Sequence, residues 1–206
     1  MKLIKMMVGN HEENCYIVGG DTSDKVIVID PGDEADKILH TLKENQMQIE
    51  YIVLTHGHPD HCGALLELKN ATGVPIAMHK ADVKLLNDDV LKFFLGMREH
   101  NPPEPDVLLE HDDIIRQGGL ELKVIHTPGH TLGGICLLGE GCIFTGDTLF
   151  KNSIGRTDLP DGSHLRLMYS LNETILTLPD ETKVYPGHGP DTTIGAERRG
   201  NPFLQS

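Results

Sequence analysis

The chain contains the stretch Thr55-His56-Gly57-His58-Pro59-Asp60-His61-Cys62-Gly63-Ala64. This stretch places three imidazoles and one carboxylate within six positions. Neutral imidazole nitrogens and carboxylate oxygens are the groups that bind zinc and similar divalent metals, and both kinds can share one site. The stretch therefore indicates a metal centre. The alternative is a polar loop whose histidines only cap the helix that follows.

The flanking sequence predicts that this stretch is a turn between a strand and a helix. The apolar run at residues 51–55 is typical of a buried strand, and the residues from His61 onward have a helical pattern. In an extended turn, side chains at positions i and i+2 point the same way, so His56 and His58 can bind one ion. Asp60 and His61 leave the backbone in another direction, which suits a second ion.

Length and composition limit the kind of protein. A chain of 206 residues is long for one small domain and short for two, so we predict a single domain spanning residues 1–206. The formal net charge is −13, whereas binding to nucleic acid requires a basic surface. We therefore expect no nucleic-acid partner.

The N-terminal segment, the apolar runs and the cysteines indicate the cellular compartment of the protein. Residues 1–5 lack the apolar core of a secretory signal, and nowhere do 18 apolar residues run together, so we expect a cytoplasmic protein without a membrane segment. The four cysteines lie far apart and form no C-x-x-C pair. Neither a zinc knuckle nor a disulfide framework is indicated, and each cysteine is expected to be a small buried residue.

The proline-rich segment 102–105 divides the chain into pseudo-halves, residues 1–101 and 106–206, because prolines remove hydrogen-bond donors and fix φ. Before it we expect strands at 3–8, 14–18, 25–29 and 74–78 and helices over 34–46, 61–71 and 80–95. After it we expect strands at 107–109, 120–126, 135–138, 142–144 and 183–185 and a helix over 164–178. Such an order suggests two α/β layers packed sheet to sheet.

Three further glycine-containing turns follow predicted strands, and each offers one metal-binding side chain. The turns are Thr127-Pro128-Gly129-His130-Thr131, Thr145-Gly146-Asp147-Thr148 and Tyr185-Pro186-Gly187-His188-Gly189. Glycine allows close backbone approach at such turns. His130, Asp147 and His188 are therefore candidate ligands, with ordinary turn residues as the alternative.

Together these motifs resemble the metallo-β-lactamase superfamily, and among its branches the small bacterial proteins similar to glyoxalase II (hydroxyacylglutathione hydrolase). The resemblance begins at Asn14 and reaches the tail at residues 197–203, with five motifs in the family's order. It implies an α/β fold of four layers, an αββα sandwich, with a two-metal site at the edge where the sheets meet. Full-length glyoxalase II carries a C-terminal helical domain that contributes to glutathione recognition, whereas only 18 residues follow His188 here, so we expect no such domain.

The resemblance assigns a role to each candidate residue. His56, His58 and His130 would hold the first metal, Asp60, His61 and His188 the second, and Asp147 would bridge both. The ions would be zinc, with iron or manganese as alternatives, since such sites accept all three. Two metals about 3.5–4 Å apart can share a hydroxide that serves as nucleophile. Asp60 would also accept a proton.

Departures from other branches narrow the choice of substrate. Asp147 stands where zinc β-lactamases carry a cysteine, which disfavours antibiotic hydrolysis. His58 stands where diiron flavoproteins carry a carboxylate, which disfavours membership of that branch. Arg156 falls where glyoxalase II has a basic residue that contacts the thiol moiety, so we expect it to bind substrate. The alternative is an ion pair between Arg156 and a neighbouring aspartate.

Three functions follow from this interpretation. The first is hydrolysis of thioesters of the S-2-hydroxyacylglutathione type, with a small-molecule thioester as the binding partner. The second is a mononuclear-iron persulfide (sulfur) dioxygenase of the same superfamily, although His58, His61 and His188 favour two metals. The third is a metal-binding module without turnover.

Overall fold

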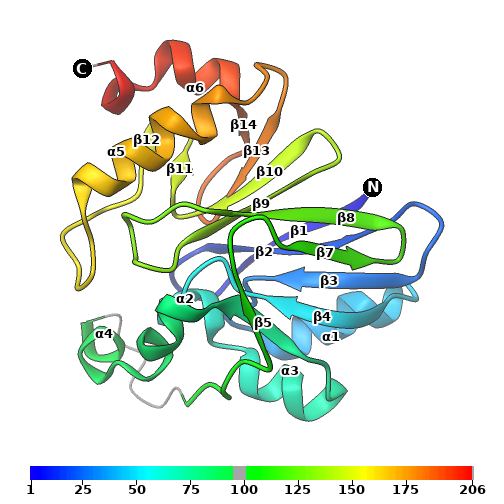
Figure 1. The fold of residues 1–206 in the computed structure, drawn as a ribbon. Coiled ribbons are helices and arrows are strands. Elements are labelled where there is room, and N and C mark those ends of the chain that lie inside the picture. The colour runs from blue at the N-terminus through cyan, green and yellow to red at the C-terminus, as the bar shows by residue number, and fades with distance from the viewer. Residues whose placement is uncertain (95–100, 206) are drawn as a thin grey trace.

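The computed structural model of the chain describes residues 1–94 and 101–205. Two six-stranded sheets pack face to face, and helices cover the outer face of each (Figure 1). This is the expected four-layer αββα sandwich. Among the described residues, no helix combines the length and apolar character needed to cross a bilayer.

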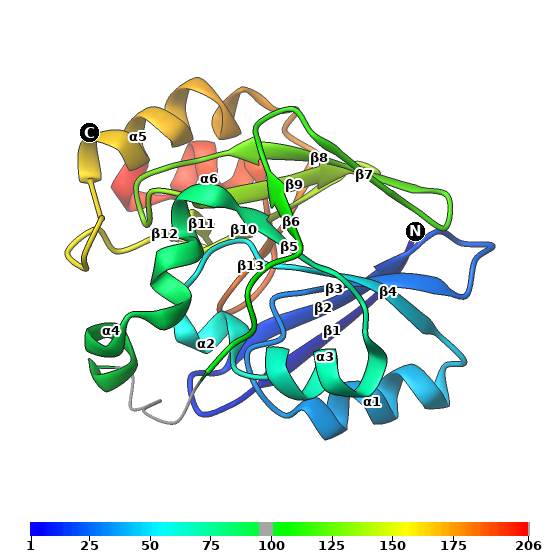
Figure 2. The same ribbon diagram turned by 60° about the horizontal axis from the view of Figure 1, so that its bottom comes forward.

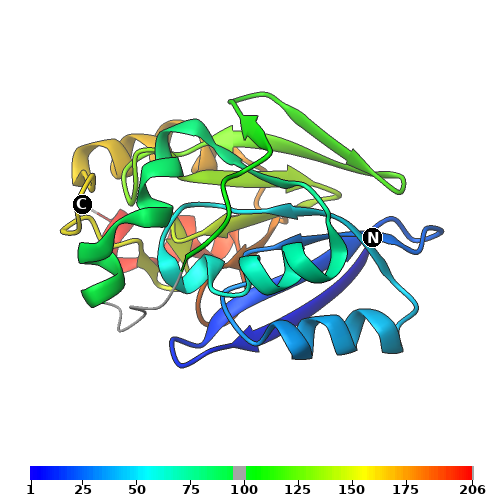
Figure 3. The same cartoon turned by 90° about the horizontal axis from the view of Figure 1, so that it is seen from below.

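The first sheet begins with an antiparallel meander and continues with parallel strands. In spatial order it consists of β1 (Lys2–Val8), β2 (Glu13–Gly19), β3 (Lys25–Ile29), β4 (Gln48–Val53), β5 (Ile76–His79) and β6 (Val107–Leu109). Its helices and 3-10 turn are α1 (Ala35–Glu44), α2 (Pro59–Cys62), α3 (Leu65–Thr72), η1 (Lys80–Asn87) and α4 (Asp89–Phe94). Seen from below, α1 and α3 lie side by side over this sheet (Figure 3).

The second sheet is mostly antiparallel, with a parallel pairing of β10 with β13. In spatial order it consists of β14 (Thr192–Thr193), β13 (Lys183–Pro186), β10 (Cys142–Gly146), β9 (Ile135–Gly139), β8 (Leu120–His126) and β7 (Ile114–Gln117). The hairpin β11 (Leu149–Phe150) and β12 (Ser153–Ile154), the helices α5 (His164–Glu173) and α6 (Ile194–Gly200), and the turns η2 (Ile175–Thr177) and η3 (Pro202–Leu204) complete this side. Figure 2 shows α5 and α6 on the outer face.

Three apolar clusters hold the four layers together. One joins the first sheet to α1 and α3, and another joins the second sheet to α5. The central cluster lies between the sheets, where Tyr16 and Phe144 meet edge to face with ring centroids 5.1 Å apart. The four cysteines are free and buried, as expected. Burial of apolar side chains on both sides of each sheet explains why the strands read as near-continuous apolar runs.

The predicted helix over 61–71 forms as two pieces, α2 and α3. The break occurs because the backbone N–H of Ala64 donates to the carbonyl of Pro31, at 3.0 Å, instead of continuing α2. The predicted helix over 164–178 similarly ends at Glu173, since Thr174 has φ −130° and only the short turn η2 follows. The prediction over 80–95 corresponds to η1 and α4, and its last residue lies outside the described residues.

The division into pseudo-halves at 102–105 needs a correction. Residues 102–105 are irregular, as predicted, but β6 follows them and pairs with β5 of the first sheet. The change from one sheet to the other therefore falls between β6 and β7. Some further elements have no clear signal in the sequence because they are short or carry many polar residues: β7, β11, β12, β14 and α6. The long parallel strands direct their carboxyl ends to one edge of the sandwich, where sites form in α/β proteins.

Candidate metal centre

The seven predicted ligands come from loops and a short helix that follow the ends of four strands. His56 and His58 lie after β4, Asp60 and His61 in α2, His130 after β8, Asp147 after β10, and His188 after β13. The structure brings all seven together in three overlapping groups. Within each group, the potential ligand atoms lie within 4.8 Å of one another.

The first group consists of His56, His58 and His130, all buried. Nδ1 of His58 lies 3.1 Å from Nε2 of His56 and 3.0 Å from Nε2 of His130, so three ring nitrogens converge on one point. Burial lowers the pKa of His58 to about 3, and neighbouring histidines contribute. Burial also lowers the pKa of His56. Both rings are therefore neutral at physiological pH, which is the form that binds metal.

The second group consists of Asp60, His61 and His188. Oδ2 of Asp60 lies 3.4 Å from Nε2 of His188 and 4.0 Å from Nε2 of His61. Burial of Asp60 opposes its ionisation, but His61 and the hydrogen bond from His188 hold its pKa below the usual range. Asp60 is therefore a carboxylate at neutral pH.

Asp147 lies between the two groups. Its Oδ1 is 3.4 Å from Nε2 of His61, and its Oδ2 is 3.6 Å from Nε2 of His130 and 3.8 Å from Nε2 of His188. Burial opposes ionisation of Asp147 as well, yet His61, His130 and His188 lower its pKa to about 2. One carboxylate can thus reach both groups.

The chemistry of the seven side chains is by itself suited to binding metal ions. Nε2 of His61 and Oδ1 of Asp147 are buried, and among the described residues neither has a hydrogen-bond partner. Native proteins rarely leave such atoms unpaired unless an ion or water binds them. All the candidate ligand atoms are imidazole nitrogen or carboxylate oxygen, the donors that zinc, iron and manganese share.

Four of the five imidazoles are fixed from behind through their second ring nitrogen. These contacts are His56 Nδ1 with Thr55 Oγ1 at 3.1 Å, His61 Nδ1 with Asp30 Oδ2 at 3.1 Å, His130 Nδ1 with the Arg156 carbonyl at 2.8 Å, and His188 Nδ1 with the His11 carbonyl at 3.1 Å. Such bonds select the tautomer and the ring orientation of a metal ligand.

Asp30 supports the site, and the sequence analysis did not single it out. It follows β3 with φ 49°, a left-handed conformation that aspartate tolerates better than most residues. Its carboxylate accepts hydrogen bonds from the Thr55 backbone N–H at 2.7 Å, the Thr55 hydroxyl at 2.6 Å and His61. The signal that could have revealed Asp30 is its place at the end of a buried strand, ahead of Pro31-Gly32.

Glu13 is a second carboxylate that sequence reasoning missed. It is 1% exposed, and its Oε1 lies 3.7 Å from Nδ1 of His61. Neither of its carboxylate oxygens has a hydrogen-bond partner among the described residues. Burial raises the pKa of Glu13 well above its usual range. Glu13, Asp30 and His61 therefore form a further close group directly behind the second metal group.

Arg156 forms an ion pair with a neighbouring aspartate, which was the alternative to a contact with substrate. Its Nε and Nη2 donate to the two carboxylate oxygens of Asp158 at 2.8 and 2.9 Å, in an exposed loop. Its carbonyl also holds His130, as described above. Contact between the guanidinium and a substrate stays a prediction.

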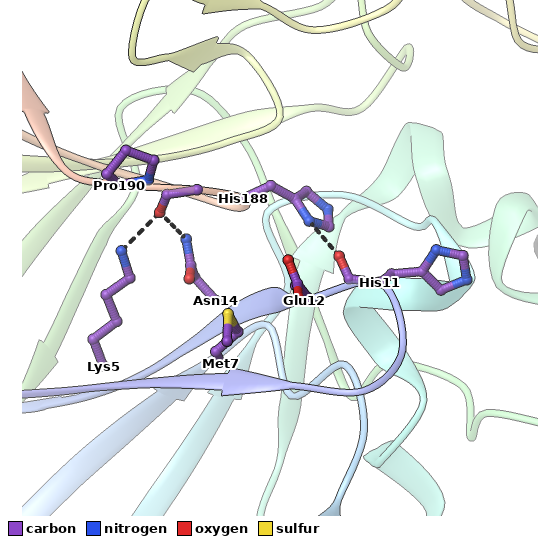
Figure 4. A pocket seen from close by; sticks show the side chains of 8 residues that line it. Lys5, Met7, His11, Glu12, Asn14, His188 and Pro190 are labelled. Atoms are coloured by element: carbon purple, nitrogen blue, oxygen red, sulfur yellow. Dashed lines mark hydrogen bonds between the residues drawn. The ribbon is translucent and has the colours of Figure 1, made fainter.

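A pocket of about 410 Å³ opens beside His188 (Figure 4). It lies between the β1–β2 hairpin and the loop after β13, with Lys5, Asn14 and His11 among its lining residues. The ammonium of Lys5 bonds to the Gly189 carbonyl at 2.9 Å and to Asp191 at 2.6 Å, and the Asn14 amide also donates to Gly189. Space for a small molecule thus adjoins the second metal group.

Comparison with known proteins identifies the family. The family model for the metallo-beta-lactamase superfamily matches residues 8–188, and the chain belongs to this superfamily. The probable metallo-hydrolase YqgX of Bacillus subtilis (strain 168) is 36% identical over 208 residues, covering 99% of this chain and 98% of that protein. Hydroxyacylglutathione hydrolase GloC of Haemophilus influenzae (strain ATCC 51907 / DSM 11121 / KW20 / Rd) is 35% identical over 203 residues, covering 95% and 94%.

Solved structures agree on the fold. The BLEG-1 B3 metallo-beta-lactamase superposes with a TM-score of 0.94 at 34% identity, covering 100% of both chains. TTHA1623 in a di-iron-bound form gives 0.89 at 38% identity, covering 98% of this chain and 100% of that one. ETHE1 from Myxococcus xanthus gives 0.83 at 29% identity, covering 98% and 84%. These likenesses confirm the αββα fold and place the chain among metal-binding hydrolases.

Proposed function

We propose that the chain hydrolyses thioesters of the S-2-hydroxyacylglutathione type with two metal ions in this centre. The observation that carries the proposal is the pair of ligand groups with Asp147 between them. The 35% identity to a hydroxyacylglutathione hydrolase supports the choice of substrate class. The geometry supports two ions because each group supplies three donor side chains of its own.

Zinc is the proposed metal, with iron or manganese as alternatives, since nitrogen and oxygen donors accept all three. Bound to these groups, the ions would polarise the thioester carbonyl and make a water molecule acidic enough to attack it near neutral pH. Asp60, which is ionised and 13% exposed at its side chain, is the proposed acceptor for the proton of that water. The departing thiolate is stable, so no strong general acid is required.

The substrate is proposed to enter beside His188. The pocket described above would accept part of the thioester, and Arg156 in the loop behind His130 would contact it after releasing Asp158. The proposed partner is therefore a small-molecule thioester in the cytoplasm, with neither nucleic acid nor membrane involved. The acidic overall charge of −13 is consistent with this choice.

Two other activities have a specific observation in their favour. Iron in the similar TTHA1623, which was solved in a di-iron-bound form, supports a test of the persulfide dioxygenase alternative, which needs one iron. The similarity to a B3 metallo-beta-lactamase supports a test of β-lactam hydrolysis, although Asp147 replaces the cysteine that the sequence analysis expected of a zinc β-lactamase. A metal-binding module without turnover would give no hydrolysis of any thioester.

The test is to purify the protein with its metals, count the metals, and assay S-D-lactoylglutathione beside simple thioesters, a persulfide and a β-lactam. We expect two metals per chain and turnover of the lactoyl thioester. His58→Ala and Asp147→Ala should each abolish that turnover while circular dichroism shows the fold retained. Full activity in either variant would refute the proposal, and oxygen consumption with a persulfide by a one-iron protein would establish the alternative.

A further inference from the structure

Asp82 is a buried carboxylate that the proposed chemistry does not use. It lies in the first turn of η1, the segment that follows β5, and is 0% exposed. Burying a carboxylate is costly unless donors surround it. Within the described part of the chain, all the hydrogen bonds that this carboxylate accepts come from two other loops, and its own segment contributes none of them.

These two loops carry the first metal group. The backbone N–H of Gly57 donates to Oδ2 of Asp82 at 3.2 Å, and the Thr131 hydroxyl donates to the same oxygen at 2.6 Å. The backbone N–H of Gly133 donates to Oδ1. Gly57 stands between His56 and His58 in the chain, and Thr131 directly follows His130. Each of the three imidazoles is therefore next to a residue that Asp82 holds.

The glycines at the contact show how closely the loops approach. A β-carbon at Gly57 would lie 2.7 Å from the Asp82 carbonyl, and one at Gly133 would lie 2.7 Å from the Asp82 carboxylate carbon. Both distances are shorter than real β-carbons adopt, so neither loop could pack here with a side chain at that position. The carboxylate is thus enclosed by backbone from both sides.

We propose that Asp82 is a positioning residue that clamps the His56–His58 loop to the His130 loop and so sets the geometry of the first metal group. Among the described residues, no hydrogen bond links the Asp82 carboxylate to Asp60, His61 or His188. The clamp therefore acts on one of the two metal positions. This inference depends on the proposed function in one respect, namely that the three imidazoles bind a metal ion.

An amide cannot replace the carboxylate here. The three groups around Asp82 are all donors, and asparagine offers one acceptor oxygen together with an NH₂ group that would face a donor. Asp82→Asn keeps the size of the side chain but leaves at least one buried donor unsatisfied. The three imidazoles would then lose their fixed spacing.

The experiment measures zinc affinity by competition with a chromophoric chelator, one metal position at a time. His188→Ala weakens the second group and leaves the first for study, and His58→Ala does the reverse. Loss of a ligand-supporting contact typically costs 10- to 100-fold in metal affinity, so we expect Asp82→Asn to weaken zinc binding at least about tenfold in the His188→Ala protein. In the His58→Ala protein we expect a change within about twofold, a pattern that a purely structural role would not produce.

Equal losses in both backgrounds, or no loss in either, would overturn the inference. Asp106→Asn is the matched control, because its carboxylate also accepts a backbone N–H, that of Ile76 at 2.8 Å, and this bond lies at the opposite end of β5 from η1. If Asp82→Asn fails to fold, Thr131→Val removes one bond of the clamp and should weaken the first position, while Thr131→Ser should restore it. Absence of thioester turnover would count against the proposed function and leave these zinc affinities interpretable.

Discussion

Replacement of Asp30 by asparagine should weaken the second metal position through a change in the tautomer of His61. Nδ1 of His61 donates to Oδ2 of Asp30 at 3.1 Å, so Nε2, which is directed at Asp147 and Asp60, is the nitrogen that gives up its proton when metal binds. Asparagine tolerates the left-handed backbone that Asp30 adopts at φ 49°, so the turn should persist. The substitution therefore isolates the effect on the carboxylate.

The magnitude follows from the hydrogen bonds that Asp30 accepts. Its two oxygens receive the Thr55 N–H, the Thr55 hydroxyl and His61, and an asparagine oxygen can occupy only one of the two oxygen positions. If the amide nitrogen faces His61, the ring must move its proton to Nε2, the atom that would bind metal. Loss of such a support costs on the order of 10- to 100-fold in metal affinity, or about 1.4–2.7 kcal/mol.

Zinc competition in a His58→Ala background, where the second group is the intact one, measures this loss directly. Asp24→Asn is a suitable control, because that exposed carboxylate accepts a hydrogen bond from the Gln48 amide at 2.7 Å and lies at the opposite end of β3 from Asp30. Zinc affinity unchanged by Asp30→Asn would show that Asp30 does not set the His61 tautomer, and the reasoning would fail.

Three further outcomes are expected. Asp147→Ala should lower zinc binding at both positions, measured as metal content after dialysis, whereas a loss of at most one metal would contradict its place between the groups. Phe144→Ala should lower the free energy of unfolding by about 3–5 kcal/mol, because this 1% exposed ring fills the space between the sheets, and urea denaturation would test this. Burial and the stacked His126 lower the pKa of His79 to about 4, so the unfolded chain takes up a proton at this residue at higher pH than the folded chain does. The metal-free protein should therefore lose stability as pH falls from about 6.5 to 4, and His79→Gln should reduce that slope, which denaturation at several pH values would measure.

Sequence alone predicted which side chains gather in this centre, because most of them stand in turns that follow strand ends. His130, Asp147 and His188 stand in glycine-containing turns, and His56 and His58 share one extended turn, so local pattern and strand register place them together. The αββα fold followed from the resemblance and from the order of strands and helices.

The supporting carboxylates could not be predicted in the same way. Asp30 reaches Thr55 across 25 positions, and Asp82 reaches Thr131 across 49. Asp30 at least stands at a strand end, but nothing local distinguishes Asp82 from the rest of the 31 acidic residues in the chain. Their roles depend on which strands become neighbours, and that is a property of the packed sheets. The break between α2 and α3 was missed for the same reason, because the Pro31 carbonyl causes it from a distance.

The most direct test of the central claim is a crystal of the zinc-loaded protein measured at the zinc absorption edge. Two anomalous peaks about 3.5–4 Å apart are expected, one among His56, His58 and His130 and the other among Asp60, His61 and His188, with Asp147 in contact with both. A single peak, or a peak bound by Glu13 and Asp30 instead, would contradict the two-metal centre.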